Sequence, residues 1–450
     1  MINIKGKKIS IIGAKESGVA AARLCKMLGA IPFVSDCDSE QKLIEYKEIF
    51  QNEGIDYELG SHTSKALECD FIVTSPGVPS NSEILTKAKQ NKIRIVSEIE
   101  FASWFCNAKI ISITGTNGKT TTTSLCAHTL KKSGYTAYAA GNIGKAFSDL
   151  ALNVSSKDFI VLETSSFQLD FIENFKPAVA VILNITPDHL DRYNNSFDEY
   201  RNSKYNVTKN QDENDLFVFN ADDENTYADV INKKVKRLGF SLKKELLNGS
   251  FYKEGKIFFA KNGFIEEVCN TNALKIKGMH NVANALAVVN VAKMLNISNN
   301  KIRDALFSFE GVEHRLEFVR EINGVKYIND SKATNVDSVW YALESFSEPI
   351  YLILGGKDKG NDYNQIRQLV KTKVKKIYAI GSSAQKIYDY FKDIVEVEFQ
   401  KSLEESVLTA RKEAQPGTIV LLSPACASFD MFENFEHRGN VFKQVVNGLV

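Results

Sequence analysis

Short apolar runs separated by charged, helix-favouring segments recur along the whole chain. In the first part of the chain these runs fall at Lys8–Ile12, Ile31–Val34, Phe71–Thr74 and Ile93–Val96. Polar segments such as Ser39–Asn52 lie between them. Because strands that alternate with helices pair side by side, this pattern predicts a parallel sheet flanked by helices.

A second series of apolar runs begins near residue 107. Lys109–Thr114, Phe159–Glu163 and Ala178–Asn184 are continuous rather than alternating, as expected for strands buried on both faces. Asn281–Leu295 carries its apolar residues on one face, which predicts a long helix. Ser250–Val268 alternates aromatic and polar residues around two glycine turns, and this predicts a small antiparallel hairpin lying outside the main sheet.

The last part repeats the first pattern. Its strand candidates are Lys326–Asn329, Ile350–Leu354, Lys376–Ile380 and Thr418–Leu422. A chain of 450 residues is long enough for about three domains. We therefore predict an α/β protein with three domains. They are an N-terminal Rossmann-like domain at 1–106, a central P-loop ATPase-like parallel sheet with a small antiparallel sheet at 107–312, and a C-terminal Rossmann-like domain at 313–450.

Composition narrows the class of protein. The formal net charge of +1 argues against a nucleic-acid binder that is held by phosphate contacts. The seven cysteines form no CxxC pair or Cys/His cluster, so they indicate reduced thiols rather than a disulfide frame or a zinc site. No run approaches the ~20 apolar residues that span a membrane. We expect a cytoplasmic protein without membrane insertion.

The segment from Thr114 to Thr121 follows a predicted strand and precedes a predicted helix. Its glycines let backbone N–H groups surround phosphates, and the helix N-terminus adds partial positive charge. Lys119 can neutralise phosphate oxygens, and the Thr120 hydroxyl can bind Mg²⁺. Ile113 stands where the usual phosphate loop has its first glycine. The alternative is a glycine turn with a chance lysine.

A weaker glycine segment, Gly13–Gly18, follows the first strand, and Asp36 follows the second. It resembles a dinucleotide fingerprint, but Lys15 replaces the middle glycine that normally admits the pyrophosphate. Nicotinamide binding is therefore disfavoured. A nucleotide bound in another way and a plain strand-to-helix turn both remain open.

Polar side chains also follow the central strands, where ligands bind in open α/β sheets. Glu163 is placed to hold Mg²⁺ near a nucleotide, with a helix-capping carboxylate as the alternative. His189 lies in a loop rich in Asp and Arg and can bind a metal or orient a carboxylate. Lys204 lies in the predicted helix Phe197–Val207, where pattern alone indicates an exposed surface lysine.

Strand ends in the last part carry a further set of candidates. Arg315 could clamp a phosphate, and Asp330 could accept a hydrogen bond from a ribose hydroxyl or from a metal-bound water. A glycine–lysine loop follows the second strand of this part, and the last strand leads to Phe435 and Arg438. Their common position at strand ends indicates an anionic co-substrate.

Eight segments together resemble the Mur ligase family, and they are spread over all three predicted domains. They are TGTNGKTT, GNIG, ETSSFQL, NITPDHLDRY, HNVANALA, EHRLE, NDSKATN and SPACASFDMFENFEHRG. The first of these is shared by the whole superfamily, including folylpolyglutamate synthases. NDSKATN with the last segment is similar to the D-glutamate-adding, MurD-type branch. The DNPR signature of the diamino-acid-adding branch is absent.

The resemblance implies an ATP-dependent ligase that couples D-glutamate to UDP-N-acetylmuramoyl-L-alanine, with ATP and two Mg²⁺ ions. The implied ATP-binding residues are Gly115, Thr116, Asn117, Gly118, Lys119, Thr120, Thr121, Asn281, Arg315, Asp330 and Lys332. The implied metal-binding residues are Thr120, Glu163, His189 and Lys204, with Lys204 carbamylated. The implied catalytic residues are Lys119, His189 and Lys204.

The resemblance also implies where the other two substrates bind. The residues implied for the UDP substrate are Glu16, Ser17, Asp36, Ser75, Pro76, Gly77, Asn142 and His189. Those implied for D-glutamate are Thr334, Lys359, Ser428 and Phe435. Cys37 departs from the pattern, since a small hydroxyl residue is common there, and the choice between Lys357 and Lys359 is open. We expect a monomer.

Three other functions compete with this interpretation. Another ligase of the superfamily would use a different amino acid or a folate. A nucleotide-binding regulatory protein would lack acceptor-site residues, yet Thr334 and Ser428 are present. A nicotinamide oxidoreductase is disfavoured by Lys15.

Overall fold

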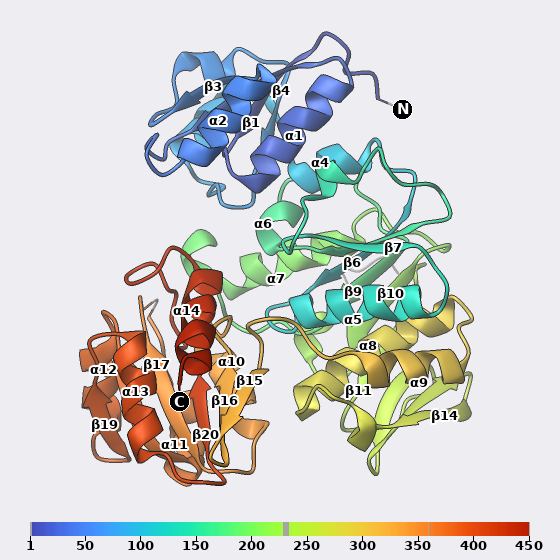
Figure 1. The fold of residues 1–450 in the computed structure, drawn as a ribbon. Helices are drawn as coiled ribbons and strands as arrows, with labels where there is room; N and C mark the ends of the chain where they lie inside the picture. Colours follow the sequence, from blue (N-terminus) through green and yellow to red (C-terminus); the bar gives the residue numbers. More distant parts are fainter. Residues whose placement is uncertain (1, 228–233, 359, 450) are drawn as a thin grey trace. The chain divides into compact units, whose positions relative to one another are not determined.

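The computed structural model describes residues 2–227, 234–358 and 360–449. The chain divides into two compact units, one of Met1–Leu274 with Ala283–Phe309 and the other of Lys275–Val282 with Glu310–Val450. Within the described residues, the strands form three sheets of five, nine and six strands (Figure 1). The predicted α/β class is confirmed, while the three exact domain boundaries stay predictions.

The five-stranded sheet of the first unit has the order β3-β2-β1-β4-β5, and all its pairings are parallel. Its strands are β1 (Lys8–Ile12), β2 (Ile31–Asp36), β3 (Asp56–Leu59), β4 (Phe71–Thr74) and β5 (Arg94–Ser97). The helices between and after them are α1 (Glu16–Met27), α2 (Ile44–Glu53), α3 (Glu83–Gln90) and α4 (Glu98–Ser103). Since β1, β2 and β4 are neighbours, the loops at their carboxyl ends lie together.

The nine-stranded sheet has the order β14-β13-β12-β11-β10-β9-β6-β8-β7. Its parallel part consists of β6 (Lys109–Thr114), β7 (Ala137–Gly141), β8 (Phe159–Glu163), β9 (Val179–Ile182), β10 (Leu216–Asn220) and β11 (Lys236–Ser241). The three predicted central strands are confirmed. Each lies between neighbours on both sides, which explains their continuous apolar sequence.

The remaining three strands correct the prediction of a hairpin outside the main sheet. They are β12 (Gly249–Lys253), β13 (Lys256–Lys261) and β14 (Phe264–Asn270), and they pair antiparallel with one another. However, β12 also pairs in parallel with β11, so these strands extend the main sheet. The contact is close, because a Cβ at Gly249 would lie 1.9 Å from the Gly239 carbonyl oxygen. A glycine at this position therefore allows the sheet to continue.

Five helices accompany the central strands in the described chain. They are α5 (Lys119–Lys132), α6 (Ser166–Leu169), α7 (Phe197–Tyr205), α8 (Met279–Met294) and α9 (Asn299–Ser308). The predicted long helix is α8, which begins two residues earlier than expected. The turn of α5 that follows β6 places Lys119 at the helix N-terminus, directly after Gly118.

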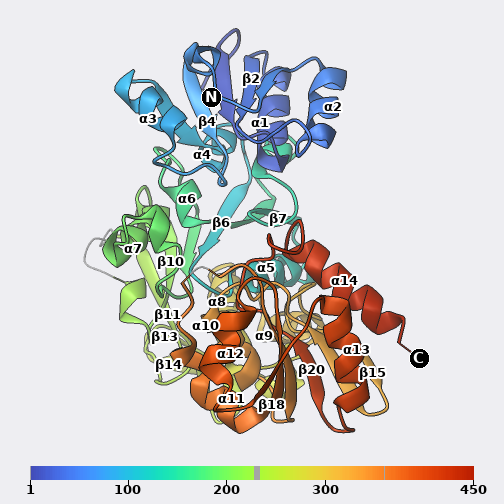
Figure 2. The ribbon, with the colours of Figure 1, turned by 90° about the vertical axis from the view of Figure 1, so that its left-hand side faces the viewer.

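The second unit is doubly wound around the sheet β15-β16-β20-β17-β18-β19. Its strands are β15 (Glu317–Ile322), β16 (Val325–Asn329), β17 (Ile350–Gly355), β18 (Val374–Ile380), β19 (Glu396–Phe399) and β20 (Ile419–Leu422). One buried cluster joins the sheet to α10 (Val336–Glu344), α11 (Arg367–Lys373) and α12 (Ala384–Phe391). Another joins it to α13 (Leu403–Glu413) and α14 (Phe435–Asn447) (Figure 2).

Two sequence-based expectations concern the whole chain. The seven cysteines are all free thiols, as predicted. Among the described residues, no helix combines the length and the apolar character that a membrane crossing requires.

Candidate active site

The loop between β6 and α5 is a tight strand-to-helix turn that depends on two glycines. Gly115 and Gly118 have φ angles of +149° and +84°, which side chains with a Cβ rarely adopt. A Cβ at Gly118 would also lie 2.6 Å from Asn284 Oδ1. Both glycines are therefore required by the backbone, and the loop amides precede the N-terminus of a helix with a basic first residue.

Two residues that follow β9 hold this loop, and sequence analysis did not single them out. Asn184 accepts a hydrogen bond from the Asn117 N–H through Oδ1 (2.8 Å) and donates one to the Asn117 carbonyl through Nδ2 (3.0 Å). Thr116 Oγ1 donates to the Thr186 carbonyl and accepts from the Thr186 N–H, each at 3.0 Å. The segment NIT, at the end of a buried strand, was the available signal. These hydrogen bonds join the loop to the end of β9.

Two lysines converge on the carbonyl groups of the loop. Lys119 Nζ donates to the Gly115 and Thr116 carbonyls at 2.9 and 2.7 Å. Lys204 Nζ donates to the Gly115 carbonyl at 2.9 Å. The interpretation of Lys204 as a surface lysine is wrong, since it is only 2% exposed. Burial, followed by the neighbouring Lys119, lowers the pKa of Lys204 well below its usual value.

Glu163 is the last residue of β8 and is buried. It pairs with Ile113 of β6, the strand that precedes the glycine loop. Its Oε1 accepts a hydrogen bond from Asn142 Nδ2 at 3.2 Å. Its Oε2 is buried and has no hydrogen-bond partner among the described residues. A buried carboxylate oxygen without a partner is costly, so a bound cation would stabilise it. Thr120, in the first turn of α5, is also buried.

His189 lies after β9 at the start of a short helical turn, η3 (Leu190–Arg192). Its backbone has φ +52°, and its Nε2 lies 3.7 Å from Asp188 Oδ2. Its ring meets Phe167 edge-on at 5.3 Å between centroids. No group of three His, Cys, Asp or Glu side chains in the described part of the chain is arranged to hold a metal ion.

Asp170 is a neighbour of this region that sequence analysis missed. It accepts a hydrogen bond from the Tyr193 hydroxyl at 3.0 Å. Burial raises the pKa of Asp170, while the charges of Asp188 and Asp170 act to raise the pKa of Lys204. The available signal was its position directly after the segment ETSSFQL.

The first sheet carries a pocket of about 370 Å³ at the carboxyl ends of β1, β2 and β4. Seven residues predicted for the UDP substrate line it, and they are Glu16, Ser17, Asp36, Ser75, Pro76, Gly77 and Asn142. His189 was predicted with them but does not line this pocket. Cys37, the departure from the family pattern, is exposed in the pocket wall.

Carboxylates dominate the glycine loop of this pocket. Asp36 accepts hydrogen bonds from the Ala14 and Asp38 N–H groups at 2.7 and 2.8 Å. Lys15 forms an ion pair with Asp38 at 3.4 Å. Glu16 accepts a hydrogen bond from the Tyr46 hydroxyl at 2.6 Å. The Ala14 amide of this loop is therefore already bound by a carboxylate of the protein.

In the second unit, Asp330 is buried after β16. It accepts hydrogen bonds from Ser423 Oγ (2.8 Å) and from the Leu316 N–H (3.2 Å). Burial raises the pKa of Asp330 to about 6, although the nearby Arg315 acts to lower it. Arg315 Nε is buried without a hydrogen-bond partner among the described residues. Asn281 donates from Nδ2 to the Lys277 carbonyl at 2.7 Å.

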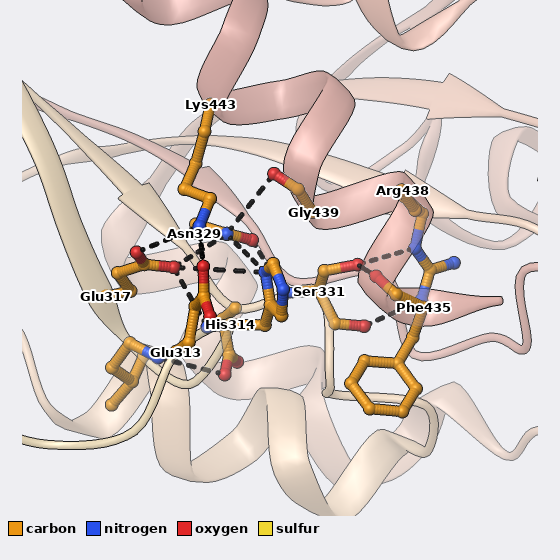
Figure 3. A network of polar contacts seen from close by, with 11 residues as sticks. Glu313, His314, Glu317, Asn329, Ser331, Phe435, Arg438, Gly439 and Lys443 are labelled. Carbon is orange, nitrogen blue, oxygen red and sulfur yellow. Dashed lines mark hydrogen bonds and ion pairs between the residues drawn. The ribbon is translucent and has the colours of Figure 1, made fainter. Parts of the chain in front are cut away.

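Arg438 joins the loops that follow β16 and β20. Figure 3 shows its hydrogen bonds to Ser331. Arg438 donates to Ser331 Oγ (3.0 Å), the Ser331 carbonyl (2.7 Å) and the Cys426 carbonyl (3.1 Å). Ser331 Oγ in turn donates to the Phe435 carbonyl at 2.8 Å. Burial lowers the pKa of Arg438 to about 10, so it remains a cation at neutral pH. Beside it, Asn329 Nδ2 lies 2.9 Å from His314 Nδ1.

The residues predicted for D-glutamate lie in or next to these loops. Ser428 is buried, and Phe435 begins α14 with Lys332 Nζ 4.9 Å from its ring centroid. Thr334 lies in the same loop as Lys332, between β16 and α10. Lys359 lies outside the described residues, so the choice between it and Lys357 stays open. The Lys357 N–H donates to the Ala427 carbonyl at 2.9 Å.

Comparison with known proteins covers nearly the whole chain. The MurD N-terminal domain matches residues 8–84, the Mur ligase middle domain matches residues 113–292, and the glutamate ligase domain of Mur ligases matches residues 314–426. UDP-N-acetylmuramoylalanine--D-glutamate ligase from Salinibacter ruber is 42% identical over 99% of both chains. The protein of the same name from Chloroherpeton thalassium is 44% identical over 99% of both.

Solved structures share the fold at lower identity. UDP-N-acetylmuramate-alanine ligase MurC from Thermotoga maritima has a TM-score of 0.64 at 21% identity, covering 98% of this chain and 99% of that one. A pseudomurein peptide ligase type C from Methanothermus fervidus has a TM-score of 0.62 at 22% identity, with the same coverage of 98% and 99%.

Proposed function

Because this chain belongs to the Mur ligase family, we propose that it adds D-glutamate to UDP-N-acetylmuramoyl-L-alanine at the expense of ATP. It would act as a monomer in the cytoplasm, in the synthesis of peptidoglycan precursors. The observation that carries the proposal is the pair of lysines, Lys119 and the buried Lys204, on the glycine loop beside Glu163. This group of residues is suited to the activation of a carboxylate by ATP.

The proposed reaction has two steps. A carboxylate oxygen of the L-alanine end attacks the γ-phosphorus of ATP, the bond to the bridging oxygen breaks, and ADP leaves. The D-glutamate ammonium group loses one proton and its nitrogen attacks the acyl carbon. The bond from this carbon to the phosphate oxygen then breaks, inorganic phosphate leaves, and the nitrogen releases a second proton to give the amide. Lys119 and the loop amides would offset the charge that spreads over the phosphate oxygens. We propose that Arg315, Asp330, Lys332 and Asn281 bind the remainder of ATP.

We further propose that Lys204 is carbamylated. Burial lowers the pKa of Lys204 and so favours its neutral amine form, which can add to CO₂ with loss of a proton. The product is an anion, which the neighbouring Lys119 would stabilise. The carbamate would add anionic oxygen ligands to this site beside those of Glu163.

We propose that two Mg²⁺ ions bind here. Glu163 and Thr120 would hold one, and His189 with the Lys204 carbamate would hold the other, with phosphate oxygens completing both sets. The partnerless Glu163 Oε2 supports the first assignment. Bound Mg²⁺ would neutralise charge on the phosphate groups and orient them.

The two other substrates are assigned by chemistry. Asp36 and Glu16 are acceptors suited to the N–H and hydroxyl groups of uridine, and Asn142 extends that pocket toward Glu163. Thr334, Lys359, Ser428 and Phe435 would bind D-glutamate. A reactive acyl phosphate must also be shielded from water until the amine attacks.

Phosphate release in the presence of ATP and UDP-N-acetylmuramoyl-L-alanine tests this proposal. We expect release only when D-glutamate is added, and not with L-glutamate or diaminopimelate. Release with diaminopimelate instead would identify a ligase of another branch. Nucleotide binding without release under any of these conditions would identify a regulatory protein and overturn the proposal.

A further inference from the structure

Arg192 connects the loop that contains His189 to the rim of the pocket on the first sheet. Its Nη1 donates to the Pro76 carbonyl at 3.2 Å, and its Nη2 donates to the Gly77 carbonyl at 3.0 Å. Both carbonyls belong to the loop that follows β4, and both residues line the pocket. One guanidinium fork therefore holds two successive peptide groups of the rim.

The Arg192 side chain also stacks on the ring of Phe167, which contacts His189. The Arg192 guanidinium carbon is 4.2 Å from the centroid of the Phe167 ring. The His189 ring meets this same ring edge-on at 5.3 Å. Phe167 belongs to α6, which starts shortly after Glu163. Phe167 is therefore in contact with both the Arg192 guanidinium and the His189 ring.

The chemistry of these contacts favours a positioning role. Arg192 is partly buried, and burial lowers its pKa, while Asp191 acts in the opposite direction. Its fork binds backbone carbonyls of the rim rather than a carboxylate. Because a trans peptide places its N–H opposite its C=O, binding of the Pro76 carbonyl turns the Gly77 N–H to the other side of that peptide. The contact thus fixes the direction of a donor in the pocket loop.

We propose that Arg192 is a positioning residue that sets the rim of the UDP-substrate pocket and ties it to the His189 loop through Phe167. This inference rests on the proposed function, because it assigns the pocket to the UDP substrate. Arg192 touches neither ATP nor the reacting carboxylate in this account. Its loss should therefore affect binding of the UDP substrate more than binding of ATP.

Steady-state kinetics of Arg192→Gln and Arg192→Lys test the proposal. We expect the KM for UDP-N-acetylmuramoyl-L-alanine to rise about tenfold in both variants, since hydrogen bonds from a charged donor are lost or weakened. The KM for ATP should stay within about twofold of wild type. Lysine should fail to restore binding, because one ammonium group cannot reproduce the planar fork or its stacking on Phe167.

Arg303→Gln is the matched control. Arg303 is partly exposed on α9, where it donates to Asn300 Oδ1 at 3.0 Å and its Nε lies 4.0 Å from Asp304 Oδ1. Its kinetics should equal those of wild type. Phe167→Leu provides a second variant in case Arg192→Gln does not fold, because it removes the stacked ring and leaves the guanidinium in place. We expect Phe167→Leu to raise the same KM about threefold.

Titration calorimetry with UDP-N-acetylmuramoyl-L-alanine alone distinguishes failure of the positioning role from failure of the proposed function. Weaker binding by Arg192→Gln than by wild type, with equal ATP binding, supports the positioning role. Equal binding of the UDP substrate by folded Arg192→Gln and wild type overturns it. Restoration of wild-type KM by Arg192→Lys would also overturn it, since charge alone would then suffice. A wild-type protein that does not bind the UDP substrate would instead contradict the proposed function.

Discussion

The first unit contains two glycine loops that share a backbone plan and differ in charge. Each follows a buried parallel strand, β1 or β6, and each leads directly into a helix, α1 or α5. In the first loop the Ala14 amide donates to the Asp36 carboxylate. In the second loop, Lys119 and Lys204 converge on the Gly115 carbonyl.

The difference shows what glycine spacing alone can and cannot indicate. Glycines predict a tight turn that brings backbone close to a ligand, and both loops have that shape. The side chains supplied by neighbouring strands decide which part of a nucleotide suits the loop. Carboxylates favour the hydroxyl and N–H groups of a nucleoside, whereas lysines favour phosphates. Two similar loops can therefore serve two different nucleotide substrates.

The largest effect is expected at the loop between β6 and α5, called the basic loop because Lys119 and Lys204 contact it. Lys119→Ala should reduce D-glutamate-dependent phosphate release by about a hundredfold or more, which corresponds to about 3 kcal/mol of transition-state stabilisation. Lys131→Ala, which removes an exposed lysine from the last turn of the same helix, should leave the rate unchanged. Near-normal turnover by Lys119→Ala would remove the distinction between the two loops.

A comparable loss with a chemical rescue is expected at Lys204. Lys204→Ala should lose about a hundredfold in rate. Acetate or propionate should partly restore it, because a free carboxylate can replace the carbamate. The same acids should not rescue Lys119→Ala, which lacks a cation rather than an anion. Absence of rescue, or absence of any loss, would contradict the carbamate.

A smaller effect, confined to the UDP substrate, is expected at the loop between β1 and α1, called the acidic loop because Asp36 binds its Ala14 amide. Asp36→Asn leaves one acceptor oxygen for the two N–H groups that Asp36 now binds. We expect the KM for UDP-N-acetylmuramoyl-L-alanine to rise about tenfold with the KM for ATP unchanged. The control is Asp56→Asn, at an exposed position in β3. An equal rise in both KM values would contradict the assignment of the UDP substrate to the acidic loop and of ATP to the basic loop.

The smallest effect on activity is expected at Glu98, which begins the helix that follows the first sheet. Glu98 is buried and accepts a hydrogen bond from the Ser148 N–H at 2.6 Å. Burial raises its pKa from 4.5 to about 7. Because the folded protein holds this proton more tightly than the unfolded chain, the contribution of Glu98 to stability is full below about pH 4.5. It is lost as pH rises toward 7.

Glu98→Gln keeps the acceptor oxygen and removes the titration. Its free energy of unfolding should rise relative to wild type between pH 4.5 and 7, by about 3 kcal/mol at the upper end. Denaturant unfolding of both proteins across this range measures the difference. Neither KM should change. A pH-independent difference would show that Glu98 titrates normally in the folded protein.

Much of the fold could be predicted because parallel strands buried on both faces leave a clear sequence signal. β1, β4, β6 and β8 have the predicted bounds. The short edge strand β3 was not predicted, since its residues are only partly buried and do not alternate clearly. The place of β12 was missed because pairing with β11 depends on a close approach at Gly249, which no local pattern reveals.

The candidate site divides in the same way. The loop between β6 and α5 has a local glycine–lysine motif, so its spacing alone indicates Lys119 and Thr120 as candidates for phosphate and Mg²⁺ binding. Lys204 lies on a polar helix, and only the resemblance to a family distinguished it from a surface lysine. Its burial depends on packing of α7 against elements far away in the sequence. Asn184 and Arg192 bind backbone carbonyl groups, and such partners cannot be deduced from side-chain types.

The central claim is that the basic loop activates a carboxylate as an acyl phosphate, and isotope transfer tests this most directly. UDP-N-acetylmuramoyl-L-alanine labelled with ¹⁸O in its terminal carboxylate would be turned over with ATP and D-glutamate. Mass spectrometry of the released phosphate should find one ¹⁸O atom per molecule of product, because a carboxylate oxygen stays with phosphorus when the amine attacks. Phosphate free of ¹⁸O, with ligation proceeding, would contradict the account.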